Sequence, residues 1–454
     1  MGAGDGRGSQ GLGWLAGEDV TSETAWHRSL ERLRAGAAPD DDLDRAIAGV
    51  LPRGDVSALP PDGVRLLVGS QSIGDADALP DEVLIGWAGE TNGYDRLILD
   101  LLGAGFRPVR ERAAGEGPSF RVVRARRDGY RIRGYRPGDE AAILELFRES
   151  FGNVLSPERW RWRYIDNPRG GPRISLAFAP GGELVCQYCA YPVRWRGLSA
   201  AVPAVGHQVG DTMTRRGARA VGRGPTSLLA RTSRHFYLTH CNGRVAFNYG
   251  FNTGNITKFS TRYVGAQVVE DVPYRELPEG ARLGGRRRFW RLYELRRIAE
   301  RSEIGAEFDA LIERVGERYG LMVERSAEYL RWRYLDCPGE RLELVAAYRR
   351  GRLAGWVATK RLPDRVEWGD ALIDPAERPA LRALVAGIRE AGLPIAGWFS
   401  ERPSWWSREL DRLGFVRRPE PQELVTIMVP FVCADAVELV RATAYYTKGD
   451  GDLF

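Results

Sequence analysis

The chain has 454 residues, 43% hydrophobic and 28% charged, with a formal net charge of +6 at pH 7. This length exceeds one ordinary hydrophobic core, so two or three domains are expected. No run reaches the roughly 20 apolar residues of a membrane helix, and the start MGAGDGRGSQGLGW lacks the features of a secretion signal, so a cytoplasmic protein that spans no membrane is predicted.

The basic residues are almost all Arg, and acidic residues are mixed with them throughout. Such mixing favours local anion-binding spots over a nucleic-acid surface. The sequence also contains C-x-x-C at Cys186 and Cys189, within the strand-like run ELVCQYCAYPVRW. Residues three apart in a strand point to opposite faces, and no second pair has zinc spacing. No metal site is predicted.

Residues 1–125 predict an accessory α/β region. The helical stretch AWHRSLERLRAG precedes the strand-like GVRLLVGSQS, and YDRLILDLLGAGFRPV and SFRVVRARR then indicate a helix and a pair of strands. This order distantly resembles the C-terminal half of a class I methyltransferase. The Gly-rich cofactor loop of those enzymes is missing, so a structural role is predicted.

A repeat begins in the middle of the chain. ERWRWRYIDNP at 158–168 aligns with EYLRWRYLDCP at 328–338, with seven identities that include a Trp and a Tyr. A helical stretch precedes each copy, and two strand-like runs around glycine follow it. The chain is therefore predicted to carry two copies of one domain. Between them, RRRFWRLYELRR at 286–297 is interpreted as a solvated helix face.

The segment that follows the third strand-like run of the first copy carries a phosphate-binding pattern. VGDTMTRRGARAVGRGPTSLLART contains R-x-x-G-x-G at 219–224, and Pro225 then opens a predicted helix. Glycines remove side chains, so backbone N–H groups can surround an anion at the positive end of a helix. This position between strand and helix predicts a phosphate cradle.

The order of strands, loop and helix resembles motif A of the GCN5-related N-acetyltransferases (GNAT), where this loop holds the pyrophosphate of acetyl-CoA. GRVAFNYGFNTGNITKFSTRYVGA at 243–266 is similar to the next strand, Asn-bearing loop and helix, and YYTKGDGDLF resembles the end of many tandem members. The resemblance covers about 130–454. It implies a mixed α+β fold with two GNAT-like domains, 128–275 and 276–454, each a mainly antiparallel sheet flanked by helices, beside the N-terminal α/β region.

The resemblance also places acetyl-CoA or another acyl-CoA, as co-substrate, in the first copy. Two strand-end residues would face its pantetheine arm, the loop would hold its phosphates, and one of two Asn would contact it from the far side, although both Asn also fit ordinary turn chemistry. These positions are Met213, Thr214, Arg219, Val221, Gly222, Arg223, Gly224, Asn252 and Asn255.

For catalysis, the resemblance implies direct attack of a substrate amine on the thioester, assisted by a base and an acid. Asp211 is the nearest match to the base, with His207 four residues earlier. Asp211 has a counterpart, Asp370, in the second copy, which also fits a structural role. The usual tyrosine acid falls on Thr261, so Tyr249 on the preceding strand is the substitute.

The second copy lacks the cradle. Aligning Gly210-Asp211 with Gly369-Asp370 places Leu381 and Ala383 on the two loop glycines, and Pro379 removes a donor. The sequence thus predicts one site, in the first copy, that transfers an acyl group from CoA to a small-molecule amine. Two alternatives stay open: a tandem transferase that uses aminoacyl-tRNA, and a non-catalytic acyl-CoA-binding module.

Overall fold

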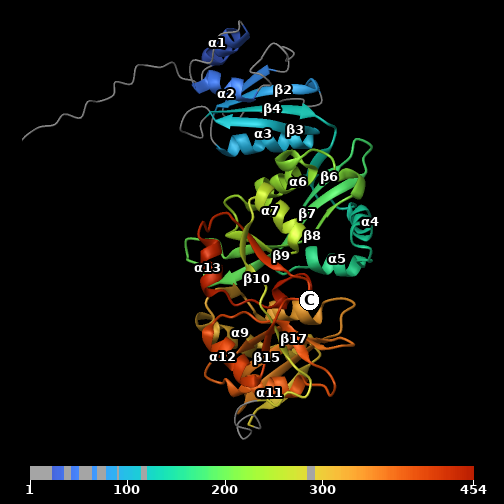
Figure 1. Ribbon diagram of the computed structural model, residues 1–454, viewed down its shortest axis with the longest axis vertical. Helices are drawn as coiled ribbons and strands as arrows, with labels where there is room; N and C mark the ends of the chain where they lie inside the picture. Colours follow the sequence, from blue (N-terminus) through green and yellow to red (C-terminus); the bar gives the residue numbers. More distant parts are fainter. Residues whose placement is uncertain are drawn as a thin grey trace, which may run out of the picture. The chain divides into compact units, whose positions relative to one another are not determined.

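A computed structural model of the chain describes residues 23–34, 42–50, 64–68, 78–88, 91–113, 120–283 and 292–454. The chain divides into two compact units, Met1–Arg131 and Ile132–Phe454 (Figure 1).

The first unit is a four-stranded sheet with three helices. Its strands are ordered β1-β2-β4-β3, with β1 parallel to β2 and the other neighbours antiparallel. The apolar stripe of α3, which includes Leu97, Ile98 and Leu101, is buried. The predicted elements are present, together with a helix, α2, and a strand, β2, that were not predicted. The bounds are α1 Glu23–Arg34, α2 Asp42–Val50, β1 Val64–Val68, β2 Glu82–Ala88, α3 Thr91–Gly103, β3 Phe106–Ala113 and β4 Phe120–Arg127.

The second unit contains two sheets, and the first of them has the strand order β10-β19-β9-β8-β7-β6-β5, with the short β13 (Met322–Val323) beside β7. Its strands are antiparallel except for β8 and β9, which run parallel. Their bounds are β5 Arg131–Gly134, β6 Arg173–Phe178, β7 Leu184–Arg196, β8 Val205–Thr214, β9 Phe247–Asn252, β10 Gln267–Asp271 and β19 Val425–Pro430.

Helices cover both faces of this sheet. Tyr188 and Ala190 of β7 pack against α6, whereas Cys189 and Tyr191 lie in the same cluster as Leu146 of α4. Successive strand residues point to opposite faces, so α4 and α6 lie on opposite sides. The bounds are α4 Glu140–Phe151, α5 Pro157–Tyr164, α6 Leu228–Phe236 and α7 Gly254–Tyr263.

The second sheet repeats the plan in the order β12-β14-β15-β16-β17-β11-β18, with β16 and β17 as its parallel pair. The mixed α+β fold of two similar, mainly antiparallel sheets is thus confirmed. The strands are β11 Tyr274–Leu277, β12 Glu294–Ile298, β14 Leu342–Arg349, β15 Arg352–Arg361, β16 Val366–Ile373, β17 Ile395–Trp398 and β18 Val416–Arg418. The helices that follow β11 are α9 Ala306–Val315, α10 Ala327–Leu330, α11 Pro379–Ile388, α12 Ser404–Leu413 and α13 Ala436–Thr443.

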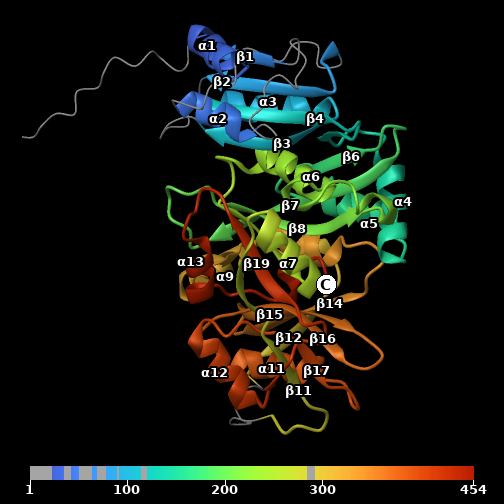
Figure 2. The same cartoon turned by 45° about the horizontal axis from the view of Figure 1, so that its top comes forward.

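The two halves exchange one strand each. β11 follows β10 in the sequence but lies between β17 and β18, and β19 follows β18 but lies between β9 and β10. In Figure 2, β11 is seen next to β17. The expected domain boundary between residues 275 and 276 therefore does not separate the two sheets, because residues 425–430 form a strand of the first sheet. Which partner a strand chooses depends on distant backbone, so local pattern cannot reveal the exchange.

The repeated sequence forms the contact between the copies. Ser156 and Ser326 each cap a helix, by accepting from the N–H of Arg159 and Tyr329. The Trp162 and Trp332 rings stack at 5.2 Å, and each indole N–H donates to the other tryptophan's carbonyl, at 2.7 and 3.0 Å. This aromatic cluster is buried scaffold.

The connecting segment differs from its prediction. Glu294–Ile298 is not helical but forms β12, which pairs antiparallel with β14. Its place in the second sheet matches that of β5 in the first. The remaining predicted helix residues, 286–291, lie outside the described part of the chain.

Candidate active site

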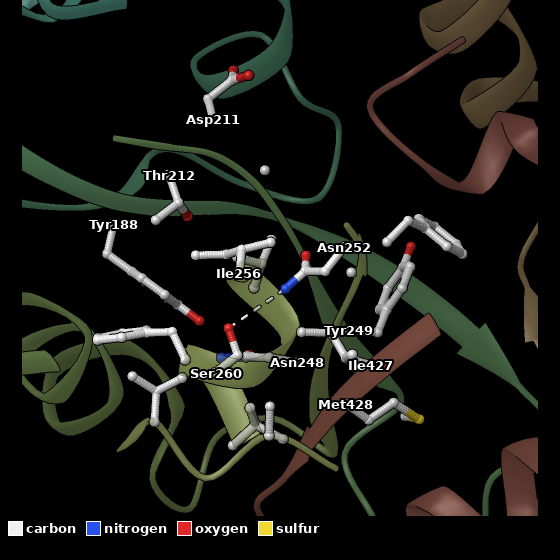
Figure 3. Close-up of a pocket in the computed structure, with 18 of the residues that line it drawn as sticks. Tyr188, Asp211, Thr212, Asn248, Tyr249, Asn252, Ile256, Ser260, Ile427 and Met428 are labelled. Carbon is white, nitrogen blue, oxygen red and sulfur yellow. Dashed lines mark hydrogen bonds between the residues drawn. The ribbon is translucent and has the colours of Figure 1, made fainter. Parts of the chain in front are cut away.

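A cleft opens where β8 and β9 part. These parallel strands pair with each other only at His207 with Asn248 and at Gln208 with Tyr249. Beyond these residues, toward Thr214 in β8 and Asn252 in β9, the two strands no longer pair with each other. The cavity between them, about 190 Å³, is closed on one side by α7 (Figure 3). We call it the central cleft. Its walls include strand edges whose backbone groups can pair with an extended ligand.

A bulge in β8 shapes this cleft. Asp211 has φ 47°, a left-handed conformation that is rare for a residue with a side chain, and the pairing of β7 with β8 shifts register here. The Gln187 side chain donates to the Asp211 carbonyl at 3.0 Å. Such strain persists only where the surroundings enforce it, and it is concentrated at functional sites.

The Asp211 carboxylate is committed to the scaffold. The Arg163 guanidinium and the Tyr164 hydroxyl both donate to its Oδ2, each at 2.7 Å. In the second copy the Tyr334 hydroxyl donates to Asp370 at 2.6 Å in the same way. Because both copies share the arrangement, it favours the structural role for Asp211 over that of the predicted base.

His207 does not fit the predicted catalytic role. It is 1% exposed and borders none of the cavities of the described residues, because its ring packs on Phe236 beside Cys241. Burial lowers its pKa to about 3. A group that reaches neither solvent nor the cleft cannot take a proton from a substrate.

Tyr249 lines the central cleft, but its hydroxyl is engaged elsewhere. It donates to the Asp450 carbonyl at 3.0 Å, so the phenol anchors the closing segment. Burial raises its pKa well above the ordinary value. Thr261 is no substitute, since its hydroxyl bonds to Thr257 and Lys258 carbonyls of its own helix.

Asp452, which was not among the predicted site residues, reaches the central cleft from the other end of the sequence. Its carboxylate lies against Gly210, where a Cβ would overlap it. The Gln208 side chain donates to its Oδ1 at 3.3 Å. Burial first, and then the Asp211 carboxylate, raise the pKa of Asp452. The sequence signal was the Gly-Asp-x-Asp ending, which shows no spatial neighbours.

The predicted phosphate loop has the conformation of a cradle. Gly222 and Gly224 have φ of 71° and 56°, and a Cβ on Gly222 would overlap the Thr226 carbonyl and lie 3.0 Å from Ser227 Cα. Only glycine fits there without strain. The Arg219 Nε donates to the Thr214 carbonyl at 3.2 Å, which ties the loop to the end of β8.

The amides that face outward are not the predicted ones. The Val221 N–H donates to Ala218 at 3.1 Å and the Arg223 N–H to the Thr226 hydroxyl at 3.3 Å. In the described part of the chain, the N–H groups of Ala220, Gly222 and Gly224 have no partner. Alternate residues of the loop thus supply its three available donors. Pro225 lies in a 3₁₀ turn, and α6 starts only at Leu228.

A second cavity, the loop pocket, lies beside the central cleft and includes the predicted Met213, Thr214 and Arg219, the last of which begins the loop. The two cavities share Thr212, Leu229, Ile256 and Phe259 and are therefore adjacent. On the far wall, the Asn252 amide faces the Ser260 hydroxyl at 3.5 Å (Figure 3). The side chain of Asn255 lies outside the described part of the structure.

The equivalent place in the second copy is filled. Leu381 and Ala383 are buried in α11, which starts at Pro379, six residues after β16 ends at Ile373. The closing segment packs into the gap beside β16: Thr447 donates to Asp370 at 2.8 Å, and the Phe454 ring lies against Gly369. Neither the central cleft nor the loop pocket reaches these residues.

The buried histidines predict a pH-dependent stability. Burial lowers the pKa of His207 and His240 to about 3 and that of His235 to about 4, whereas an unfolded histidine titrates near 6.5. The stability that these neutral histidines contribute is complete above about pH 6.5 and is lost as the pH falls toward 4, because the unfolded chain binds protons first. We expect the free energy of unfolding to be about 3–6 kcal/mol lower at pH 5 than at pH 7.

Urea unfolding at the two pH values measures this difference. The variant His235→Gln, which removes one of the three groups, should reduce the pH dependence by about a third. An unchanged pH dependence in the variant would show that other groups cause it.

A comparison with solved structures found several that are similar to the chain. The chain is similar to a GCN5-related N-acetyltransferase from Kribbella flavida (14% identity, 68% of this chain and 72% of that one, TM-score 0.49). It is also similar to a probable N-acyltransferase from Enterococcus faecalis V583 (12%, 67% and 73%, 0.48) and to the Saccharomyces cerevisiae N-myristoyltransferase with bound myristoyl-CoA (10%, 66% and 83%, 0.42). At such identities and TM-scores, these likenesses carry no conclusion about activity.

No protein-family model matches the chain, and no curated protein matches it. Among the described residues, no helix is long and apolar enough to cross a membrane.

Proposed function

We propose that the chain is an acyl-CoA-dependent N-acyltransferase whose first copy transfers an acyl group from CoA to a primary amine. One observation carries the proposal: the cleft between β8 and β9 adjoins the loop pocket, which reaches Arg219 at the start of a loop whose three amides have no partner in the described residues. A donor with phosphates at one end and a thin, polar arm at the other fits this path.

The loop suits the phosphates of CoA. The amides of Ala220, Gly222 and Gly224 lie in one turn, and the exposed guanidinium groups of Arg219 and Arg223 flank it. Backbone amides beside the start of a helix form a positive site for an anion. The second copy offers no such turn, so one CoA per chain is expected.

The parted strands suit the arm of the donor. Beyond Gln208 and Tyr249 the facing edges of β8 and β9 have no strand partner, so amide groups of a pantetheine chain can bond there as a further strand would. Ile256 and Phe259 of α7 close the apolar side of the path. The thioester that CoA supplies would then lie in the central cleft.

The residues around the thioester can assist transfer by holding and orienting the reactants. The Asn252 amide and the Ser260 hydroxyl lie on the α7 side of the central cleft and can donate to the departing sulfur. Tyr249, Thr261 and His207 do not offer a free group to the cleft.

Turnover tests the proposal. The full chain, given acetyl-CoA and longer acyl-CoAs with a panel of primary amines, is expected to release free CoA only when an amine is present, as measured by a thiol-reactive dye. Binding of CoA without amine-dependent release would instead support the non-catalytic binding module. Salt-sensitive binding of tRNA without binding of CoA would support the aminoacyl-tRNA alternative.

A further inference from the structure

A second opening, the side pocket, joins the central cleft away from the phosphate loop. It has a volume of about 390 Å³ and is lined by apolar side chains of α4 and the segment after it, together with Leu453. Phe151, Val154 and Leu453 are 48%, 81% and 42% exposed. They are three of the seven large hydrophobic side chains exposed in the described residues, and all three border this pocket. Such concentration marks a binding surface.

Asp452 lies where the side pocket meets the central cleft, because it lines both. Its carboxylate accepts from the neutral Gln208 side chain, and no ion pair joins it to another described residue. Of the two arginines of the pocket, Arg159 pairs with Glu340, and Arg163 pairs with Asp211 at 2.7 Å and also donates to the backbone carbonyl of Asp452 at 3.4 Å. The Asp452 carboxylate itself forms no ion pair within the described residues, although the charge of the nearby Arg163 counteracts the rise of its pKa.

We propose that the side pocket binds the acceptor, a primary amine that carries an aromatic or aliphatic apolar group, and that Asp452 binds its ammonium group and takes its proton. This inference rests on the proposed acyltransferase function. The exposed apolar side chains of the pocket would contact the apolar part of the acceptor, and the Asp452 carboxylate would bind its ammonium group.

The geometry gives a balanced step. The ammonium group gives one proton to the Asp452 carboxylate, and the free amine forms a C–N bond to the thioester carbonyl carbon. The C–S bond then breaks, and the sulfur leaves with the second proton lost by the nitrogen. Asp452 returns its proton to solvent. The products are an amide, free CoA and one proton.

The surroundings of Asp452 set its pH response. The titratable and charged groups that face it are Asp211, Arg163, Tyr191 and Cys189, and burial together with Asp211 raises its pKa above that of an ordinary Asp. A base must be ionised to work, so kcat/KM is expected to fall as the pH falls through this raised pKa. The fall should begin at a higher pH than for an exposed carboxylate.

Asp452→Asn tests the carboxylate. We expect kcat/KM for 2-phenylethylamine to fall by about 10²–10⁴-fold, the range of general base catalysis, and the acidic limb of the pH profile to disappear. CoA affinity should stay unchanged, because Asp452 does not line the loop pocket. Retention of both the rate and the acidic limb would overturn the role of Asp452.

Val154→Asn tests the apolar rim without risk to the core, since Val154 is 81% exposed. Its KM for 2-phenylethylamine should rise by about tenfold, the effect of losing one apolar side-chain contact, whereas the KM for ethanolamine should not change. The matched control Val416→Asn, at an exposed valine that borders no cavity of the described residues, should behave as the wild type.

The outcomes separate the two proposals. If the wild type binds CoA and acylates amines but prefers ethanolamine to 2-phenylethylamine, the acceptor class is wrong and the acyltransferase function stands. If no amine is acylated by any acyl-CoA, the acyltransferase function itself fails.

Discussion

Gly222→Ala is expected to remove most of the binding of CoA. At φ 71° any side chain is strained, and the new Cβ would overlap the Thr226 carbonyl, so the loop must rearrange. Restoring the cradle then costs at least about 1–2 kcal/mol, which corresponds to roughly tenfold or more in affinity. Isothermal titration with CoA measures the loss, and the rise of the thermal midpoint caused by CoA should shrink accordingly.

Gly217→Ala is the matched control, five positions earlier on the same side of the sheet. A Cβ on Gly217 meets no atom within 4 Å, and its φ is not in the left-handed range. This variant should bind CoA as the wild type does. Equal affinity of the two variants, whether both normal or both weakened, would contradict the assignment of 219–224 as a cradle.

Trp332→Ala is expected to be the most destabilising of the substitutions considered. The ring is 5% exposed, stacks on Trp162 and takes part in two reciprocal hydrogen bonds between the copies. Removing a buried Trp costs about 3–5 kcal/mol. The substitution also removes the Trp332 indole N–H, which donates to the Trp162 carbonyl, so that buried carbonyl is left without a donor. Urea unfolding measures the loss.

The double variant with Trp162→Ala tests whether the two rings stabilise the protein as a pair. Because the two rings are in contact, the sum of the losses of stability in the two single variants should exceed the loss in the double variant by about 1 kcal/mol. Additivity within about 0.5 kcal/mol would mean that each ring packs independently and that the copies do not depend on this contact.

Much of the fold follows from local sequence. The alternating runs around Gly181 and Gly351 predict the hairpins that become β6-β7 and β14-β15, and the repeated Arg-Trp-Arg-Tyr segment predicts two copies. The exchange of β11 and β19 could not be predicted in this way, because both strands satisfy the same apolar pattern in either sheet. The pairing of β19, Val425–Pro430, with β9 and β10 and that of β11 with β17 and β18 distinguish the two arrangements.

The candidate site was predictable where chemistry is local and not where it depends on folding. Gly222 must be glycine for reasons contained in one turn, and the sequence shows this directly. His207 was a candidate base because it lies four residues before Asp211 on the same strand. Its side chain is instead buried against Phe236 of α6 and does not reach the cleft. Asp452 lies more than 240 residues from Gln208, with which it shares a hydrogen bond, so no spacing rule connects them.

Hydrogen–deuterium exchange of the full chain with and without CoA tests most directly whether the first copy alone holds the donor. We expect CoA to slow exchange in peptides covering 209–229 and 249–260, which form the central cleft and the loop pocket. Peptides covering 366–388, the equivalent place in the second copy, should not change. Protection at 366–388, or none at 219–224, would contradict a single site in the first copy.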